Sequence, residues 1–173
     1  MTTRRNYTRE EWNYLESLPF LVGGFVSAVD SGFLGRLVEA FSLVPTVFKT
    51  AKRFPRNQLI QAVVQGQQAH GGGKGKAEKR FSEEADAKNV RDLCLHACRK
   101  VAEILEQKSY PAEATEFKRW VVAIGEEIAN ASGEGLRFRD FRSLGRRTIT
   151  RRVSVKEEEA LHAVREALGL PEL

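Results

Sequence analysis

The chain has 173 residues, of which 42% are hydrophobic and 29% are charged. This balance is ordinary for a globular protein, so we expect one domain (residues 1–173) with a buried core. Two cysteines, Cys94 and Cys98, exclude a disulfide framework, because a bridge between positions four apart on a regular helix has poor geometry. The net charge of +5 comes from residues 133–152, which hold seven arginines and two acids, while the rest of the chain is electrically balanced.

The longest apolar stretch, residues 18–48, is the part of the chain around which we expect the rest to pack. Before it, residues 8–11 (Thr-Arg-Glu-Glu) form a capping-box pattern, which predicts a short helix over residues 9–18. Pro19 suits the first turn of a helix, where its missing N–H is not needed. A new helix is therefore expected from Pro19 to about Val29.

Residues 30–32 (Asp-Ser-Gly) predict a turn, and a second apolar helix is expected from Phe33, kinked or restarted at Pro45. The two arms would form a helical hairpin. One arm is too short to span a membrane and the other is interrupted by charges and proline, so we expect a core hairpin and no membrane span. The polar start of the chain resembles no secretion leader, which favours a cytoplasmic location.

Residues 55–64 predict another short helix, and residues 66–76 predict a glycine-rich loop. This loop does not match a phosphate-binding P-loop. Gln68 stands where the motif needs its first glycine, and Gly75 stands where Ser or Thr would bind magnesium.

Two long helices are predicted over residues 82–107 and 111–131, because apolar side chains recur at helical spacing in both. A second capping box at residues 154–157 opens a last helix, and Gly169 marks its end. Together these elements predict an all-α fold, a single bundle of about seven helices.

The few residues that suggest chemistry have simpler explanations. His96 lies between Cys94 and Cys98 but points away from both on a helix, and no second ligand pair follows, so we expect no metal and no cofactor. Glu159 and His162 match once a di-iron pattern that must occur twice.

Two carboxylates, Asp30 and Glu39, interrupt the apolar stretch. If buried, they would have perturbed pKa values and would be candidate functional groups. We favour the simpler explanation, a turn-capping Asp30 and a Glu39 at the solvent edge.

The arginine-rich segment is the strongest functional signal. Arginine binds phosphate through two parallel hydrogen bonds, and Phe138 and Phe141 between the arginines could stack on bases of a single strand. Alternatively, these arginines pair with acidic residues of the chain or of a neighbouring subunit. The candidate anion- or nucleic-acid-binding residues are Arg137, Arg139, Arg142, Arg146, Arg147, Arg151 and Arg152.

A set of short motifs scattered over most of the chain resembles small all-α bacterial proteins of unknown function. The motifs are Glu11-Trp12, Glu116-Phe117-Lys118 with Trp120, Glu134-Gly135, and Val153-Ser154 with Glu157. The resemblance implies an all-α fold in a bacterial cytoplasm and brings no catalytic residues. The arginine-rich stretch after Gly135 is unusual for such proteins.

These observations lead to one main functional expectation. We expect a non-enzymatic, cytoplasmic helical bundle that acts by self-association, most simply as a homodimer, or by binding a protein partner. Gly23-Gly24 would permit close helix approach in such an assembly. The alternative is an anion- or nucleic-acid-binding module that uses residues 133–152, and a bundle enzyme or metal carrier ranks third.

Overall fold

The computed structural model describes residues 4–31, 43–70, 87–135 and 153–171. Within these ranges the chain is all-helical, with no strand, which confirms the predicted fold class. After a short 3-10 turn, η1 (Arg4–Asn6), six α-helices are described. They are α1 (Arg9–Ser31), α2 (Leu43–Ala51), α3 (Gln58–His70), α5 (Ala87–Lys108), α6 (Pro111–Gly135) and α7 (Val155–Ala167).

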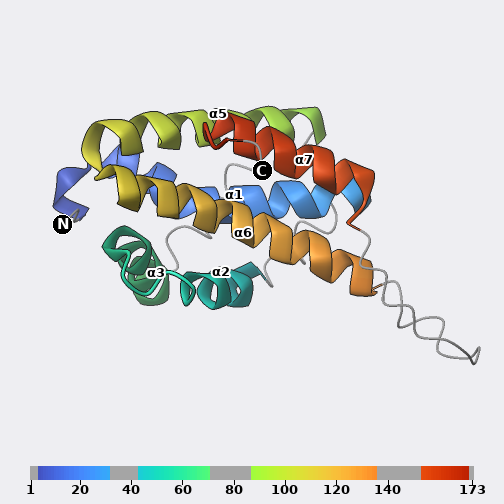
Figure 1. Ribbon diagram of the computed structural model, residues 1–173, viewed down its shortest axis with the longest axis horizontal. Helices are drawn as coiled ribbons and strands as arrows, with labels where there is room; N and C mark the ends of the chain where they lie inside the picture. Colours follow the sequence, from blue (N-terminus) through green and yellow to red (C-terminus); the bar gives the residue numbers. More distant parts are fainter. Residues whose placement is uncertain (1–3, 32–42, 71–86, 136–152, 172–173) are drawn as a thin grey trace, which may run out of the picture.

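Helix α1 is the centre of the bundle, and it packs mainly against α5, α6 and α7 (Figure 1). Helices α2 and α3 lie on the opposite side of α6 from α5 and α7. The most deeply buried side chains of α1 include Leu15, Leu18, Leu21 and Val22. The first arm of the predicted apolar hairpin therefore forms the core, whereas residues 32–42 of the second arm lie outside the described ranges.

The predicted helix boundary at Pro19 is wrong, because α1 continues through it from Arg9 to Ser31. A proline inside a helix removes one backbone hydrogen bond and costs about 3 kcal/mol. Pro19 is itself buried, and the turns on both sides of it bury apolar side chains against three helices. This tertiary packing outweighs the local preference to restart the helix. The predicted turn at residues 30–32 is also corrected, since Asp30 and Ser31 are still helical.

Two glycines allow the helices to approach closely within the chain. A Cβ atom on Gly23 would lie 2.8 Å from Cδ1 of Ile128, and one on Gly125 would lie 2.7 Å from Cδ2 of Leu161. Gly23 and Gly24 are both buried in the core. The close approach expected of Gly23-Gly24 in an assembly is thus used inside the monomer, between α1 and α6.

Helix α3 is longer than predicted, and it shortens the expected glycine-rich loop. It begins at Gln58 and continues to His70, so the start of the predicted loop at residues 66–70 is helical. Gly66 is needed for packing, because a Cβ there would lie 2.8 Å from Oε1 of the buried Glu16. Residues 71–76 of the predicted loop lie outside the part that the structure describes.

The start of α1 and both ends of α7 follow the sequence signals. Thr8 and Glu11 form the predicted capping box of α1, and Ser154 and Glu157 form that of α7. At the end of α7, Gly169 has a φ of 66°. The backbone N–H groups of Gly169 and Leu170 donate to the carbonyls of Glu166 and Arg165, which completes a Schellman motif. Helix α6 continues four residues beyond the predicted end, to Gly135.

No helix in the described ranges is both long enough and apolar enough to cross a membrane. This agrees with the expectation that the apolar stretch is part of a core.

Candidate interaction surface

Helix α2 and the turn that follows it combine buried side chains with exposed cations. The inner side chains of α2 (Leu43, Val47, Thr50 and Ala51) are buried against the bundle. The outer positions, on α2 and on the turn that leads to α3, carry exposed cations. We call this surface the basic face; its members are Lys49, Lys52, Arg53 and Arg56.

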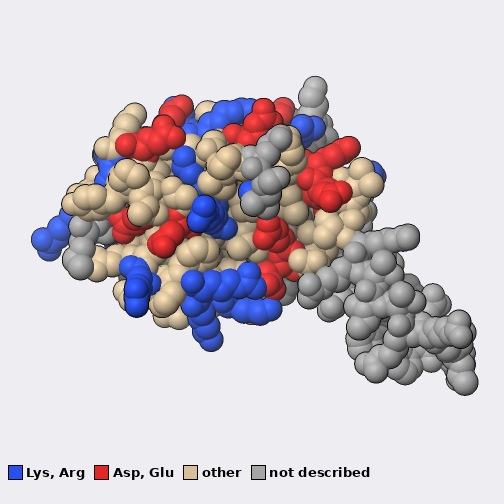
Figure 2. Space-filling model, viewed as in Figure 1, with Lys and Arg blue, Asp and Glu red and all other residues tan. Residues whose placement is uncertain are grey.

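The basic face is visible in the space-filling view, where Lys and Arg side chains gather over α2 at the lower edge of the molecule (Figure 2). Lys49 belongs to α2, whereas Lys52, Arg53 and Arg56 lie in the turn between Ala51 and Gln58. All four side chains are exposed to solvent.

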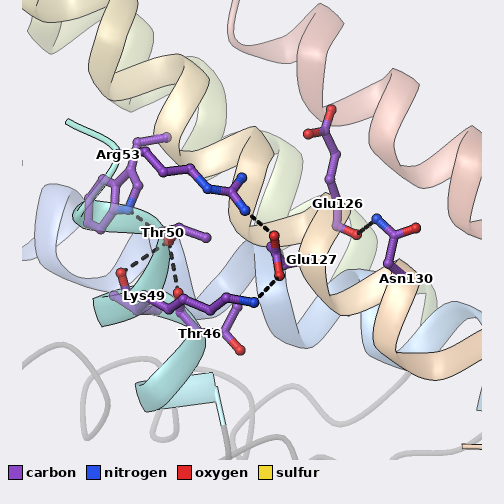
Figure 3. Close-up of polar contacts among 9 residues, drawn as sticks. Thr46, Lys49, Thr50, Arg53, Glu126, Glu127 and Asn130 are labelled. Atoms are coloured by element: carbon purple, nitrogen blue, oxygen red, sulfur yellow. Dashed lines mark hydrogen bonds and ion pairs between the residues drawn. The ribbon is translucent and has the colours of Figure 1, made fainter. Parts of the chain in front are cut away.

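One carboxylate, Glu127 of α6, pairs with two of these cations (Figure 3). Its Oε2 lies 2.9 Å from Nζ of Lys49, and its Oε1 accepts a hydrogen bond from Nη2 of Arg53. The hydrogen bond from Lys49, followed by that from Arg53, holds the pKa of Glu127 below its ordinary value. Glu127 is therefore ionised at neutral pH and ties α2 to α6.

The neighbouring Glu126 does not join this group. Its side chain points away from Glu127 (Figure 3), and its carboxylate lies 3.8 Å from Nη1 of Arg165 on α7. The two consecutive glutamates thus connect α6 to different helices. Both glutamates therefore have cationic partners among the described residues.

A buried hydrogen bond fixes α2 beneath the basic face. The indole Nε1 of Trp120, which is fully buried in α6, donates to Oγ1 of Thr50 at 3.1 Å. Thr50 itself lies 2.8 Å from the carbonyl oxygen of Thr46, to which its hydroxyl can donate. Phe117 packs edge-on against Trp120, with ring centroids 5.4 Å apart. Helix α2, which carries Lys49 and leads into the turn with the other three cations, is consequently held in one position.

The turn between α2 and α3 is also held by side chains. Asn57, which is buried, caps α3 by accepting a hydrogen bond from the backbone N–H of Ile60 at 3.0 Å. Its Nδ2 donates to the carboxylate of Glu116 at 2.9 Å. From α3, Nε2 of Gln61 donates to the carbonyl of Phe54 at 3.1 Å. Arg56 therefore projects from a backbone that is fixed on both sides.

Two carboxylates elsewhere in the fold, the half-buried Glu113 and the buried Glu157, serve as helix caps. Oε1 of Glu113 accepts from the backbone N–H of Leu59 at 3.2 Å, and Oε2 of Glu157 accepts from that of Ser154 at 2.9 Å. The second oxygen of each has no hydrogen-bond partner in the described part of the chain. Their geometry assigns both a structural role at a helix start.

The predicted chemical sites give a mixed picture. The seven arginines of residues 133–152 lie outside the described ranges, as do Glu39 and the side chain of Asp30. Cys94 and Cys98 are fully buried, and a hydrogen bond between the two thiols, together with burial, raises the pKa of Cys94 well above its ordinary value. The Cys94 thiol is therefore protonated at neutral pH and makes a poor nucleophile or ligand.

His96 and His162 are both exposed, on α5 and α7 respectively. Across the described residues, no three or more His, Cys, Asp or Glu side chains come together in a way that could hold a metal ion.

The basic face was missed in the sequence, although its signal is present there. Four of the eight residues from Lys49 to Arg56 are cations. The charge balance outside residues 133–152 concealed them, because acids far away in the sequence offset them in the count. Only the fold shows that Glu127, from a distant part of the sequence, reaches this surface to pair with two of them.

Comparisons with known proteins give no relative from which a function for the basic face could be inferred. A scan with protein-family models, a search of curated proteins and a search of solved structures each found no match.

Proposed function

We propose that this protein is a non-enzymatic, cytoplasmic helical bundle that acts by binding proteins, either another copy of itself or a different partner. The observation that supports the proposal is the basic face, in which four exposed cations stand on a firmly anchored helix and turn. Charged surfaces of this kind steer and select protein partners. A rigid surface also loses little conformational freedom on binding.

Between the two modes, the packing of α1 favours a different partner over self-association. The expected dimer would use close helix approach at Gly23-Gly24. Yet Leu18, Leu21 and Val26 are buried by the chain's own helices, and Gly23 lies against Ile128. A homodimer would therefore need another surface.

The experiment is purification of the tagged full chain at low salt, followed by light scattering and analysis of everything that elutes with it. We expect the mass of a dimer of the 19.5 kDa chain, or a stoichiometric protein partner. A monomer that carries only nucleic acid or a metal ion would contradict the proposal.

The alternative function, anion or nucleic-acid binding, is favoured by one specific observation, the concentration of seven arginines in residues 133–152. Phosphate contacts of this kind give binding that weakens steeply with salt. An oligonucleotide titration therefore separates the two functions.

A further inference from the structure

Half of the basic face has no counter-charge among the residues that the structure describes. Lys52 and Arg56 make no ion pair or hydrogen bond to any residue that the structure describes, while Lys49 and Arg53 share the single carboxylate of Glu127. Four cations against one anion leave a local positive excess on this surface. A partner that brings carboxylates can satisfy Lys52 and Arg56 without breaking an existing pair.

Apolar side chains border these cations. Pro45 and Pro55 are exposed, and Val44 and Phe48 are half-buried at the edge of the core. On α2, Pro45, Phe48 and Lys49 are three and four residues apart and so share one side of the helix. The surface thus combines positive charge with apolar contact area, as protein-binding surfaces commonly do.

From these features we infer that the basic face binds an acidic segment of another protein, one in which carboxylates alternate with apolar side chains. The inference rests on the proposed function and specifies its partner. Each carboxylate of the segment would pair with Lys52 or Arg56, and the apolar side chains would cover Pro45 and the rim of Phe48.

A protein segment fits this surface better than a phosphodiester chain does. Glu127 lies between Lys49 and Arg53 and is 25% exposed, so a continuous line of phosphates would meet a negative charge within the footprint. The rings of Phe48 and Phe54, the two described aromatic residues beside these cations, are packed against the core and partly buried, which disfavours stacking of bases on them. A peptide can place its carboxylates selectively and keep them away from Glu127.

The test uses two fluorescein-labelled peptides of about 20 residues, the number that one side of a standard interface contributes. One peptide is poly-glutamate, and in the other every fourth glutamate is replaced by leucine. Binding to the full chain is measured by fluorescence anisotropy at about 50 mM salt, where surface charges are weakly screened. We expect both peptides to bind, and the leucine-containing peptide to bind more tightly.

Substitutions locate the binding site. Lys52→Glu/Arg56→Glu is expected to weaken binding at least about tenfold, because two attractive contacts become repulsive. The matched control is Arg91→Glu/Arg99→Glu, which makes the same change in net charge at exposed positions of α5, across the molecule from α2 (Figure 1). Its binding should stay within about twofold of the unmodified protein, since its charges lie beyond a screening length of about 10 Å from a local site.

A gain-of-binding variant completes the test. Glu127→Gln removes the internal competitor and frees Lys49 and Arg53, so binding should tighten about threefold, the size of one exposed ion pair. Thermal unfolding of each variant verifies that it is folded.

Several outcomes would overturn the inference. Equal losses of peptide affinity in Lys52→Glu/Arg56→Glu and in Arg91→Glu/Arg99→Glu would mean that net charge alone attracts the peptides. Absence of peptide binding would reject the acidic partner, and if light scattering still shows a dimer, the proposed function would survive that rejection. A third outcome is that the peptides do not bind but a single-stranded oligonucleotide does. If Lys52→Glu/Arg56→Glu then abolishes oligonucleotide binding, the basic face binds nucleic acid and both proposals are rejected.

Discussion

At the scale of single residues, the contact between Trp120 and Thr50 decides how firmly α2 is attached. Trp120 is the largest fully buried side chain, and its only polar atom is satisfied by Thr50 of α2. A buried N–H that loses its acceptor is destabilising, because water no longer solvates it. The pair therefore couples the core of α6 to the helix that carries the basic face.

Removing the hydroxyl alone should measure this coupling. Thr50→Val keeps the side-chain shape but leaves the indole N–H unpaired, so we expect the free energy of unfolding to fall by about 1–3 kcal/mol. Trp120→Ala also opens a cavity and should lower it by about 3–5 kcal/mol. Urea unfolding measures both losses. Thr50→Ser retains an acceptor oxygen and serves as the control; a loss as large as that of Thr50→Val would argue against the hydrogen bond.

Glu127 gives the ion-pair group a defined pH dependence. Hydrogen bonds from Lys49 and Arg53 keep the pKa of Glu127 lower in the folded chain than in the unfolded chain. In the unfolded chain a glutamate has a pKa of about 4.3. The unfolded state therefore binds the proton more readily. The stabilisation is present above that ordinary value and disappears as the pH falls through the lowered one.

We accordingly expect Glu127→Gln to be less stable than the unmodified protein at neutral pH, and equally stable in strong acid. Because the group is partly exposed, the difference should not exceed about 1 kcal/mol. Melting temperatures across the acid range measure it. Glu126→Gln, with the same loss of charge one residue earlier and a looser pair at 3.8 Å, is the control. A difference that persists in strong acid would contradict the titration of Glu127.

At the scale of helices, glycine in α6 sets the distance between three elements. A Cβ on Gly125 would meet Leu161 of α7 and, at 3.4 Å, both Val22 and Val26 of α1. The two valines are stiff, β-branched side chains that cannot turn away easily. The site has no room for a larger side chain.

Gly125→Val should therefore destabilise the fold by about 1–3 kcal/mol through overpacking. Ala131→Val, at an exposed position of the same helix, places the same β-branched side chain in solvent and isolates the helix-propensity effect. Differential scanning calorimetry compares the two. Equal melting temperatures would show that α1, α6 and α7 separate at little cost.

Local patterns predicted the ends of elements better than their interiors. The capping boxes at Thr8 and Ser154 and the stop at Gly169 are local chemistry, and all three are confirmed. Pro19 and Gly66 were misinterpreted as breaks because their helices depend on packing partners far away in the sequence. The basic face was missed for the same reason, since the pairing of Glu127 with α2 exists only in the folded chain.

At the scale of the whole molecule, two cation-rich regions of the sequence bear on function. The basic face is fixed on α2 and its turn, while the other region is the arginine-rich segment, residues 133–152. The two regions belong to different proposed functions. A binding experiment therefore has to change each region separately.

The last prediction concerns the arginine-rich segment. A fluorescent single-stranded oligonucleotide is titrated at low salt with the unmodified chain, with Arg146→Ala/Arg147→Ala, and with Lys52→Glu/Arg56→Glu as the comparison. Because the proposed partner is a protein, we expect no binding tighter than about 100 μM, the weak end of non-specific affinity. The arginine variant should instead change the melting temperature or the oligomeric state, since its arginines would then pair with carboxylates. Two results together would establish the nucleic-acid function instead. Binding would be tighter than this limit, and the slope of log binding constant against log salt concentration would fall by about one unit for each phosphate-contacting arginine removed.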